Sequence, residues 1–386
     1  MTDKVQTNVK RGRIYWMDNL RTIIIFLVVL YHVGGVYESA GLWSSFWIVD
    51  DPDTMTWVGI MGIVFDLFMM PTMFFIAGYL TPPSLDKKSG WGFVKGKIKR
   101  LMVPWLIAVF TLIPLYRVIF LYSRGLPQEN WQNYIYFIDP NSQSWLWFLP
   151  LLFVFDLIYL AGNKLGIKFP KISLAWMVGL SFVLSLGFSY WIGNVAGFRT
   201  WTSTPILDFE NERLLAHFLF YIAGIICYRR NVFAEQPKSK TMYVVASSVA
   251  WLPVTGHIFV RLWPFFVPGF SVTPLYQILW FVSFHLSSLV MVYLMVESFR
   301  LYATKTGKLW DVLNRNSYGV YIIHVIVIGV FGTLLLMTNP PAVVKWLLLI
   351  ASTYIGSNLI VSLYRSVRAS LARNRSQEVS QRVEAA

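Results

Sequence analysis

The chain has little charge and almost no cysteine. Only 13% of its 386 residues are charged, whereas a soluble globular protein carries roughly 25%. The single cysteine, Cys227, excludes a disulfide within the chain and a cysteine-based metal cluster. The motifs GxSxG and HExxH and the P-loop are also missing. These absences argue against a large soluble core and leave histidine as the best available proton-handling side chain.

Long apolar segments fill most of the sequence. Hydrophobic residues make up 56% of it, and the mean hydropathy is +0.55. Each apolar stretch can cross a hydrocarbon core of about 30 Å as a helix. The ten stretches lie at 20–38, 57–80, 100–122, 144–162, 172–193, 212–228, 241–260, 274–300, 315–337 and 342–364. We therefore predict an all-α, polytopic integral membrane protein with about ten transmembrane helices. Since the first 16 residues are too polar and basic for a cleaved signal peptide, we expect the first helix to remain.

Basic residues are unevenly distributed along the chain. Twenty-seven of the 33 Lys and Arg residues lie near the termini or in alternate connections, those at 81–100, 161–171, 229–240 and 300–315. Most acidic residues lie in the other connections, among them Glu38, Asp50, Asp51, Asp53, Glu129, Asp139, Asp208, Glu210 and Glu212. Because cytoplasmic loops carry an excess of Lys and Arg, both termini are predicted to be cytoplasmic. This topology explains the net charge of +14 without a nucleic-acid partner.

No internal repeat and no second domain are evident. The chain divides into a short N-terminal segment, 1–15, a membrane domain, 16–364, and a basic tail, 365–386, with the segment and the tail expected in the cytoplasm. The tail is polar and is expected to be loosely ordered. It is either solvated or in contact with anionic lipid headgroups.

The first apolar segment carries three polar side chains with a regular spacing. Asp18 lies three residues before Arg21, and His32 follows eleven residues after it. Successive residues of a helix turn by about 100°, so all three project from one face. At 1.5 Å per residue Arg21 and His32 are about 16 Å apart, too far for contact. One elongated ligand could touch both, although a structural role for His32 and a simple interfacial ion pair for Asp18 remain alternatives.

The ninth segment carries a second polar stripe. Asn314, Ser317, Tyr321 and His324 follow at spacings of three, four and three residues, which place them on one side of a helix. Such side chains could line a substrate path. They could equally form the hydrogen bonds between helices that membrane bundles often use.

Two further groups have both a functional and a structural interpretation. Lys97 and Arg100 enter the third segment on adjacent positions of one face, where they could bind phosphates or simply follow the positive-inside bias. Trp145 and Trp147 open the fourth segment, where an aromatic belt is the alternative to a binding role. The sequence assigns no partner to three acids, Asp66, Asp156 and Glu297. Three histidines, His217, His257 and His285, are interpreted as structural.

The sequence resembles the membrane acyltransferase 3 family, whose first helix carries an Arg, ten intervening residues and a His. Arg21 and His32 match that spacing. Later segments agree in order: FFIAGYL at 74–80, KIKRLMVPWL at 97–106, LWFLPLLF at 146–153 and SYGVYIIH at 317–324. The family often has a His before Leu-Trp-Phe, where this chain has Trp145. The resemblance covers about residues 15–365.

The resemblance implies transfer of an acyl group, acetyl or succinyl, from cytoplasmic acyl-CoA to a hydroxyl of an extracytoplasmic glycan or lipid-linked sugar. A branch that succinylates periplasmic glucans is the nearest in pattern, and the plasma (bacterial inner) membrane is the expected location. No cofactor is expected, since acyl-CoA is a substrate. A transporter or flippase of a glycan or lipid is the alternative, but such proteins often show inverted repeats.

Under this hypothesis His32 is the general base, Arg21 orients the donor or the base, and Asp18 fixes Arg21. An acyl-histidine relay is a variant. The donor phosphates are assigned to Arg100 and Lys97. Substrate contacts are assigned to the remaining candidates, Trp147, Ser317, Tyr321 and His324.

Overall fold

The computed structural model describes residues 13–38, 47–135, 143–167, 169, 171–234 and 240–384. Residues 1–12 of the predicted N-terminal segment, 1–15, therefore lie outside the described residues. Part of the first acidic connection, 39–46, also lies outside them, as does Asp139.

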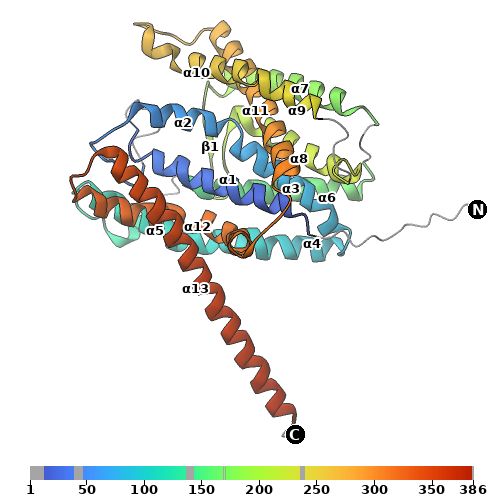
Figure 1. Cartoon of the computed structure of the whole chain (residues 1–386), viewed down its shortest axis with the longest axis vertical. Coiled ribbons are helices and arrows are strands. Elements are labelled where there is room, and N and C mark those ends of the chain that lie inside the picture. Colours follow the sequence, from blue (N-terminus) through green and yellow to red (C-terminus); the bar gives the residue numbers. More distant parts are fainter. Residues whose placement is uncertain are drawn as a thin grey trace, which may run out of the picture.

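Helices dominate the described chain (Figure 1). The first half contains α1 (Tyr15–Gly34), α2 (Thr56–Asp66), α3 (Met69–Leu85), α4 (Gly90–Lys97), η1 (Ile98–Met102), α5 (Val103–Ser123), η2 (Trp131–Tyr134), η3 (Ser144–Trp147) and α6 (Phe148–Lys164). The second half contains α7 (Leu174–Val195), η4 (Asn211–Arg213), α8 (Leu214–Arg229), α9 (Thr241–Val249), α10 (Trp251–Phe266), α11 (Pro274–Tyr302), α12 (Lys308–Leu336) and α13 (Ala342–Glu384). An antiparallel hairpin, β1 (Trp201–Ser203) and β2 (Asp208–Glu210), was not predicted.

The predicted all-α membrane architecture is confirmed. In the part of the chain that the structure describes, nine helical segments are long and apolar enough to cross a membrane. The helix at the remaining predicted position, α8, has 16 residues and is shorter than those nine. The protein is therefore an integral membrane protein built from helices.

Several spans are interrupted rather than continuous. The second span breaks between α2 and α3, directly after Asp66. The third contains a π-helical turn, η1, between α4 and α5. Single π turns within α-helices are often found at functional sites. Irregular backbone at membrane depth is tolerated where protein surrounds it, so these interruptions indicate positions that other helices must cover.

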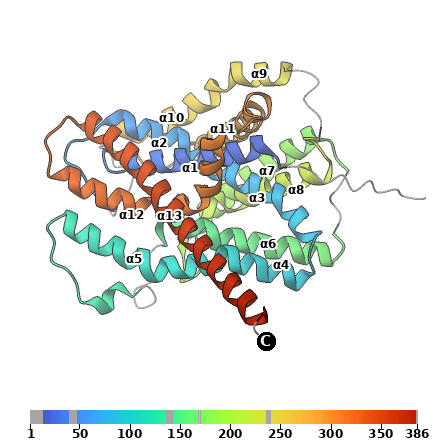
Figure 2. The same ribbon diagram turned by 60° about the horizontal axis from the view of Figure 1, so that its bottom comes forward.

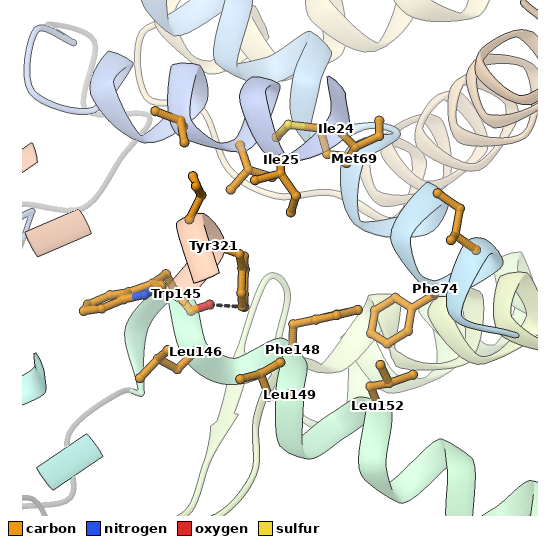
Figure 3. Packing of buried hydrophobic residues seen from close by; sticks show 14 of the residues in the cluster. Ile24, Ile25, Met69, Phe74, Trp145, Leu146, Phe148, Leu149, Leu152 and Tyr321 are labelled. Carbon is orange, nitrogen blue, oxygen red and sulfur yellow. Dashed lines mark hydrogen bonds between the residues drawn. The ribbon is translucent and has the colours of Figure 1, made fainter. Parts of the chain in front are cut away.

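The centre of the bundle is occupied by α1. It packs against α2, α3, α11, α12 and α13, as the two views of the bundle indicate (Figures 1 and 2). Figure 3 shows part of the adjoining core, in which Ile24 and Ile25 of α1 lie near Met69, and Phe74 lies near Phe148. The residues with the candidate chemistry on α1 are thus held inside the protein rather than in lipid.

Two glycines let α3 and α8 approach closely. A Cβ atom on Gly78 would lie 1.9 Å from the carbonyl oxygen of Tyr221, and one on Gly224 would lie 2.1 Å from that of Phe75. Small residues at such crossings allow backbone-to-backbone packing in membranes. This close approach explains why the FFIAGYL segment contains glycine in its middle.

The C-terminal tail is helical. α13 continues from the tenth span through Glu384 without a break, and its C-terminal half projects away from the bundle (Figure 1). The expected loose order of the tail is wrong within the described residues, and no structural boundary falls at 364. The segment 365–384 has no Gly or Pro, so nothing in it ends a helix that the membrane span has already nucleated.

Candidate active site

His32 and His324 meet between α1 and α12. Nε2 of His324 lies 3.0 Å from Nδ1 of His32, and the two ring centroids are 4.9 Å apart. His324 is completely buried and His32 is half-buried. The sequence placed each histidine on a polar face of its own helix, but it did not predict that the two would be in contact.

The surrounding carbonyl groups determine where the protons of this pair reside. Nδ1 of His324 is 2.7 Å from the carbonyl oxygen of Tyr321, which can only accept, so Nδ1 carries the proton and Nε2 accepts. Nδ1 of His32 is 2.9 Å from the carbonyl oxygen of Val28 and faces Nε2 of His324, so it donates to both. The lone pair of His32 is therefore on Nε2, the atom that could take a proton from a substrate.

Aromatic side chains surround the histidine pair. The His32 ring stacks on Trp47, with centroids 5.1 Å apart and planes at 10°, and contacts Tyr31 edge-on at 5.3 Å. Tyr116 lies 6.5 Å from Trp47 and 5.9 Å from Trp145 between ring centroids. These rings limit the orientations open to the imidazole of His32.

Arg21 and Asp18 lie toward the other end of α1. Arg21 Nη2 donates to the carbonyl oxygen of Asn314 at 3.0 Å and lies 3.3 Å from Asp18 Oδ1. Asp18 therefore does bind Arg21, but it also accepts from Arg13 Nε at 2.7 Å. Both ends of the Arg-His motif thus contact α12, which confirms that they share one face of α1.

A buried amide network joins these helices near Arg21. Thr22 Oγ1 donates to the side-chain oxygen of Asn314 at 2.5 Å, and the Asn314 amide donates to Asn19 at 3.0 Å. The Asn19 amide in turn donates to the carbonyl oxygens of Ala303 and Lys305. These bonds fix the register of α1 against α12, and with it the contact between the two histidines.

Ser317 and Tyr321 make protein hydrogen bonds. Ser317 Oγ donates to the carbonyl oxygen of Asn314 at 3.1 Å, and the Tyr321 hydroxyl donates to the carbonyl oxygen of Trp145 (Figure 3). The indole of Trp145 donates to the carbonyl oxygen of Ile322 at 2.8 Å. The Tyr321 bond is the interhelical contact that the sequence left open as an alternative, so the role of Ser317 and Tyr321 in substrate binding stays a prediction.

The two tryptophans of the fourth span face different partners. Trp145 contacts α12, as described above. Trp147 instead lies 5.9 Å from Trp201 and 5.7 Å from His217 between ring centroids, and 6.2 Å from Phe74. Hence Trp145, which stands where the family often has His, is the member of the pair that adjoins the histidine site.

Lys97 and Arg100 have different environments. Lys97 Nζ lies 2.7 Å from Oδ1 of Asp156, whose side chain is completely buried. Arg100 is exposed, and it is near enough to Arg21 and Lys97 to interact with both electrostatically. The π-helical turn η1 begins between the two residues, and its wider turn changes the angle between them from that of an α-helix.

Other intramembrane acids have basic partners that the sequence did not reveal. Arg213 binds both oxygens of Asp66 at 2.8 Å and Glu210 at 2.9 Å. Burial raises the pKa of the Glu210 carboxyl above its usual range, while Arg213 opposes this change. Glu297 pairs with Arg300 at 3.0 Å. The partners of Asp66 and Glu297, which lie within spans, compensate for burying charge at membrane depth.

The remaining histidines have structural contacts. His285 Nε2 lies 2.9 Å from Ser189 Oγ, and His257 Nδ1 lies 3.0 Å from Ser283 Oγ. The ring of His217 stacks on Phe74 at 4.9 Å. Their interpretation as structural residues agrees with these contacts.

Comparisons with known proteins connect this arrangement to an enzyme family. A family model described as an acyltransferase domain matches residues 14–362. Glucans biosynthesis protein C of Escherichia coli strain SMS-3-5 is 22% identical over 266 residues, which cover 62% of this chain and 66% of that protein. The protein of the same name from Salmonella gallinarum strain 287/91 is 24% identical over 167 residues, covering 43% and 42%. No solved structure matches.

The chain spans just under two thirds of the length of the Escherichia coli relative. The family model, by contrast, covers nearly the whole chain, including α1 with Arg21 and His32 and α12 with His324. These findings favour an enzyme over a transporter. The protein belongs to the acyltransferase 3 family and is an integral membrane protein.

Proposed function

We propose that the protein moves an acyl group, acetyl or succinyl, from cytoplasmic acyl-CoA to a hydroxyl of an extracytoplasmic glycan or lipid-linked sugar, with His32 as general base. The observation that carries this proposal is the histidine pair. Hydrogen bonds to Val28 and His324 hold the proton of His32 on Nδ1 and leave the lone pair on Nε2. A general base needs such an atom within hydrogen-bond reach of the proton that it removes.

In the proposed reaction, Nε2 of His32 removes the proton from the acceptor hydroxyl as the oxygen attacks the thioester carbonyl. The tetrahedral intermediate then collapses, the carbon–sulfur bond breaks, and the imidazolium returns the proton to the leaving thiolate of CoA. The products are an ester and free CoA. In the variant with an acyl-histidine intermediate, Nε2 itself attacks the thioester and the carbon–sulfur bond breaks to release the CoA thiolate. The acceptor oxygen then takes the acyl group from Nε2, the hydroxyl proton goes to the thiolate, and His32 is left neutral.

The donor is proposed to enter at the end of α1 that carries Arg21. Arg21, Lys97 and the exposed Arg100 place three positive charges near one another there. Phosphate groups of CoA would form charge-assisted hydrogen bonds with such side chains. Because Asp156 already neutralises Lys97, Arg100 is the stronger candidate. Asp18 then acts by orienting Arg21.

Acceptor contacts are assigned to the opposite end of the site. Trp147 is half-buried and lies beside Trp201 of the β1–β2 hairpin, in a connection predicted to be extracytoplasmic. On α12, Ser317, Tyr321 and His324 lie between Asn314, which Arg21 contacts, and the contact with His32, and they are proposed to bind the substrate along that stretch. The name of the relatives, glucans biosynthesis protein C, supports a glycan as the acceptor. The bacterial plasma membrane is the proposed location.

Release of CoA from labelled donors tests this proposal. Purified protein would be incubated with acetyl-CoA or succinyl-CoA and an oligosaccharide or lipid-linked sugar fraction, and free thiol and labelled acceptor would be measured. We expect equal amounts of both products from the wild type and neither from His32→Ala. Wild-type turnover in a folded His32→Ala protein would refute the role of His32. Labelled sugar crossing a membrane without any CoA release would favour a flippase.

A further inference from the structure

Two arginines without carboxylate partners flank one tryptophan, Trp280 of α11. The guanidinium carbons of Arg199 and Arg261 each lie 5.0 Å from the ring centroid of Trp280. Arg261 belongs to α10 and Trp280 to α11, while Arg199 lies in the connection before β1. Within the described residues neither guanidinium forms an ion pair with a carboxylate, and Nε of Arg261 is buried without a hydrogen-bond partner.

The nearby acids do not supply the missing charge. Asp66 is close enough to interact electrostatically with Arg261, but both of its oxygens are already bound by Arg213, which also binds Glu210. Arg213 is itself one of the positive charges acting on Arg261. Arg199, Arg213 and Arg261 therefore lie near one another, and their positive charges repel. Stacking of Arg199 and Arg261 on the indole of Trp280 compensates for only part of this electrostatic cost.

The position of Arg199 is fixed by the backbone. Its φ angle is 58°, in the left-handed region that non-glycine residues rarely adopt, and its backbone N–H donates to the carboxylate of Glu212. A strained residue persists where its surroundings determine it, and such residues gather at binding sites. The side chain of Arg199 is exposed while that of Arg261 is half-buried, so the pair is open on one side.

Tyr31 is the residue that connects the arginine cluster with the proposed base. Tyr31 interacts electrostatically with Arg261 and Arg213, and its ring lies 5.3 Å from that of His32. A molecule bound at Arg261 would therefore have to extend past Tyr31 to present its reacting atoms to His32. An ionisable residue within a membrane span, as Arg261 is, marks a candidate functional site.

We propose that Arg199 and Arg261 bind an anionic group of the substrate, a carboxylate or a phosphate, while His32 acts on its reacting atoms. This inference rests on the proposed acyl transfer. Two sources share the chemistry: the distal carboxylate of a dicarboxylic acyl group, and a phosphate or carboxylate on the acceptor. Arginine suits either one, because its planar fork binds such oxygens in pairs.

Binding is tested first and does not depend on turnover. The thermal unfolding midpoint of the purified protein would be measured against increasing succinate or inorganic phosphate, with chloride at the same ionic strength as reference. We expect a rising midpoint in the wild type, and a concentration for half of the maximal shift about tenfold higher in Arg261→Gln. Arg261→Lys should lie between them. Arg117→Gln, which removes an arginine paired with Glu129, should behave as wild type.

Arg199→Gln provides a second variant on an exposed residue if Arg261→Gln does not fold. An equal midpoint shift in all variants, or no shift in the wild type, would overturn the arginine site even if acyl transfer is found. If the wild type binds anions but releases no CoA, the site stands and the proposed function fails.

Turnover then identifies the source of the anion. If the acyl group carries it, Arg261→Gln should lower kcat/KM about tenfold for succinyl-CoA and leave acetyl-CoA unchanged. If the acceptor carries it, both donors should lose activity equally. Unchanged kcat/KM with both donors would contradict the proposal.

Discussion

Removal of His324 should weaken catalysis far less than removal of His32. Loss of a general base costs about 10²–10⁴-fold in rate. His324 contributes one hydrogen bond to Nδ1 of His32, at 3.0 Å, and the carbonyl oxygen of Val28 remains as a second acceptor at 2.9 Å. The tautomer of His32 is therefore preserved without His324. One hydrogen bond is worth about 0.5–1.5 kcal/mol, so His324→Ala should lower kcat about two- to twelve-fold.

Purified variants would be compared by their rates of CoA release at saturating donor. KM for acyl-CoA should be unchanged in His324→Ala, because the residue acts on the base. His324→Gln, whose side-chain oxygen can accept from His32, should recover most of the loss. His285→Gln is the matched control, since it alters a buried histidine that binds Ser189 instead.

The double variant gives the decisive comparison. If His324 acts through His32, then adding His324→Ala to His32→Ala should cost nothing further. If the rate losses of the two single variants multiply in the double variant, then His324 acts independently of His32. A loss in His324→Ala as large as that in His32→Ala would show that the Val28 carbonyl does not hold the tautomer. Either result would refute the reasoning.

Three further predictions follow from the fold and the donor side. Arg100→Gln should raise KM for acyl-CoA with less effect on kcat, and the rise should shrink in high salt; an unaltered KM at low salt would refute the donor site. Gly224→Ala should lower the thermal midpoint, whereas Gly179→Ala, where an added Cβ meets nothing, should not; equal midpoints would refute close packing of α3 and α8. Lys97→Met should destabilise by about 3–5 kcal/mol in chemical unfolding, and Lys97→Met with Asp156→Leu should recover stability; a neutral single variant would contradict the buried pair.

The sequence predicted the helices well because hydrocarbon thickness sets their length. Apolar stretches must reach about 20 residues to cross a bilayer, and this requirement is visible without any alignment. It also predicted that Arg21 and His32 share a face, since helical periodicity alone decides this. The break after Asp66 was missed because it does not interrupt the hydrophobicity of the second segment. The β1–β2 hairpin was missed because it lies in a connection between two apolar segments.

The contacts that define the site could not be predicted from local patterns. His32 and His324 are 292 residues apart, and Asp66 and Arg213 are 147 apart. Periodicity fixes which side of a helix a residue occupies, but it carries no information on which helix lies opposite. The one available signal was the free energy of burying a charge, because an acid at membrane depth must have a basic partner. That signal predicts that a partner exists without saying where it lies.

The partner of His32 differs in kind from the partners of the buried acids. Asp66 and Asp156 are bound by cationic side chains, and a cation beside a carboxylate favours its charged form. A carboxylate beside His32 would likewise favour the imidazolium, which has no lone pair and cannot accept a proton. His324 and the Val28 carbonyl are neutral acceptors, so they orient the ring without favouring its protonated form. Neutral acceptors at Nδ1 thus suit a base that must begin the reaction neutral.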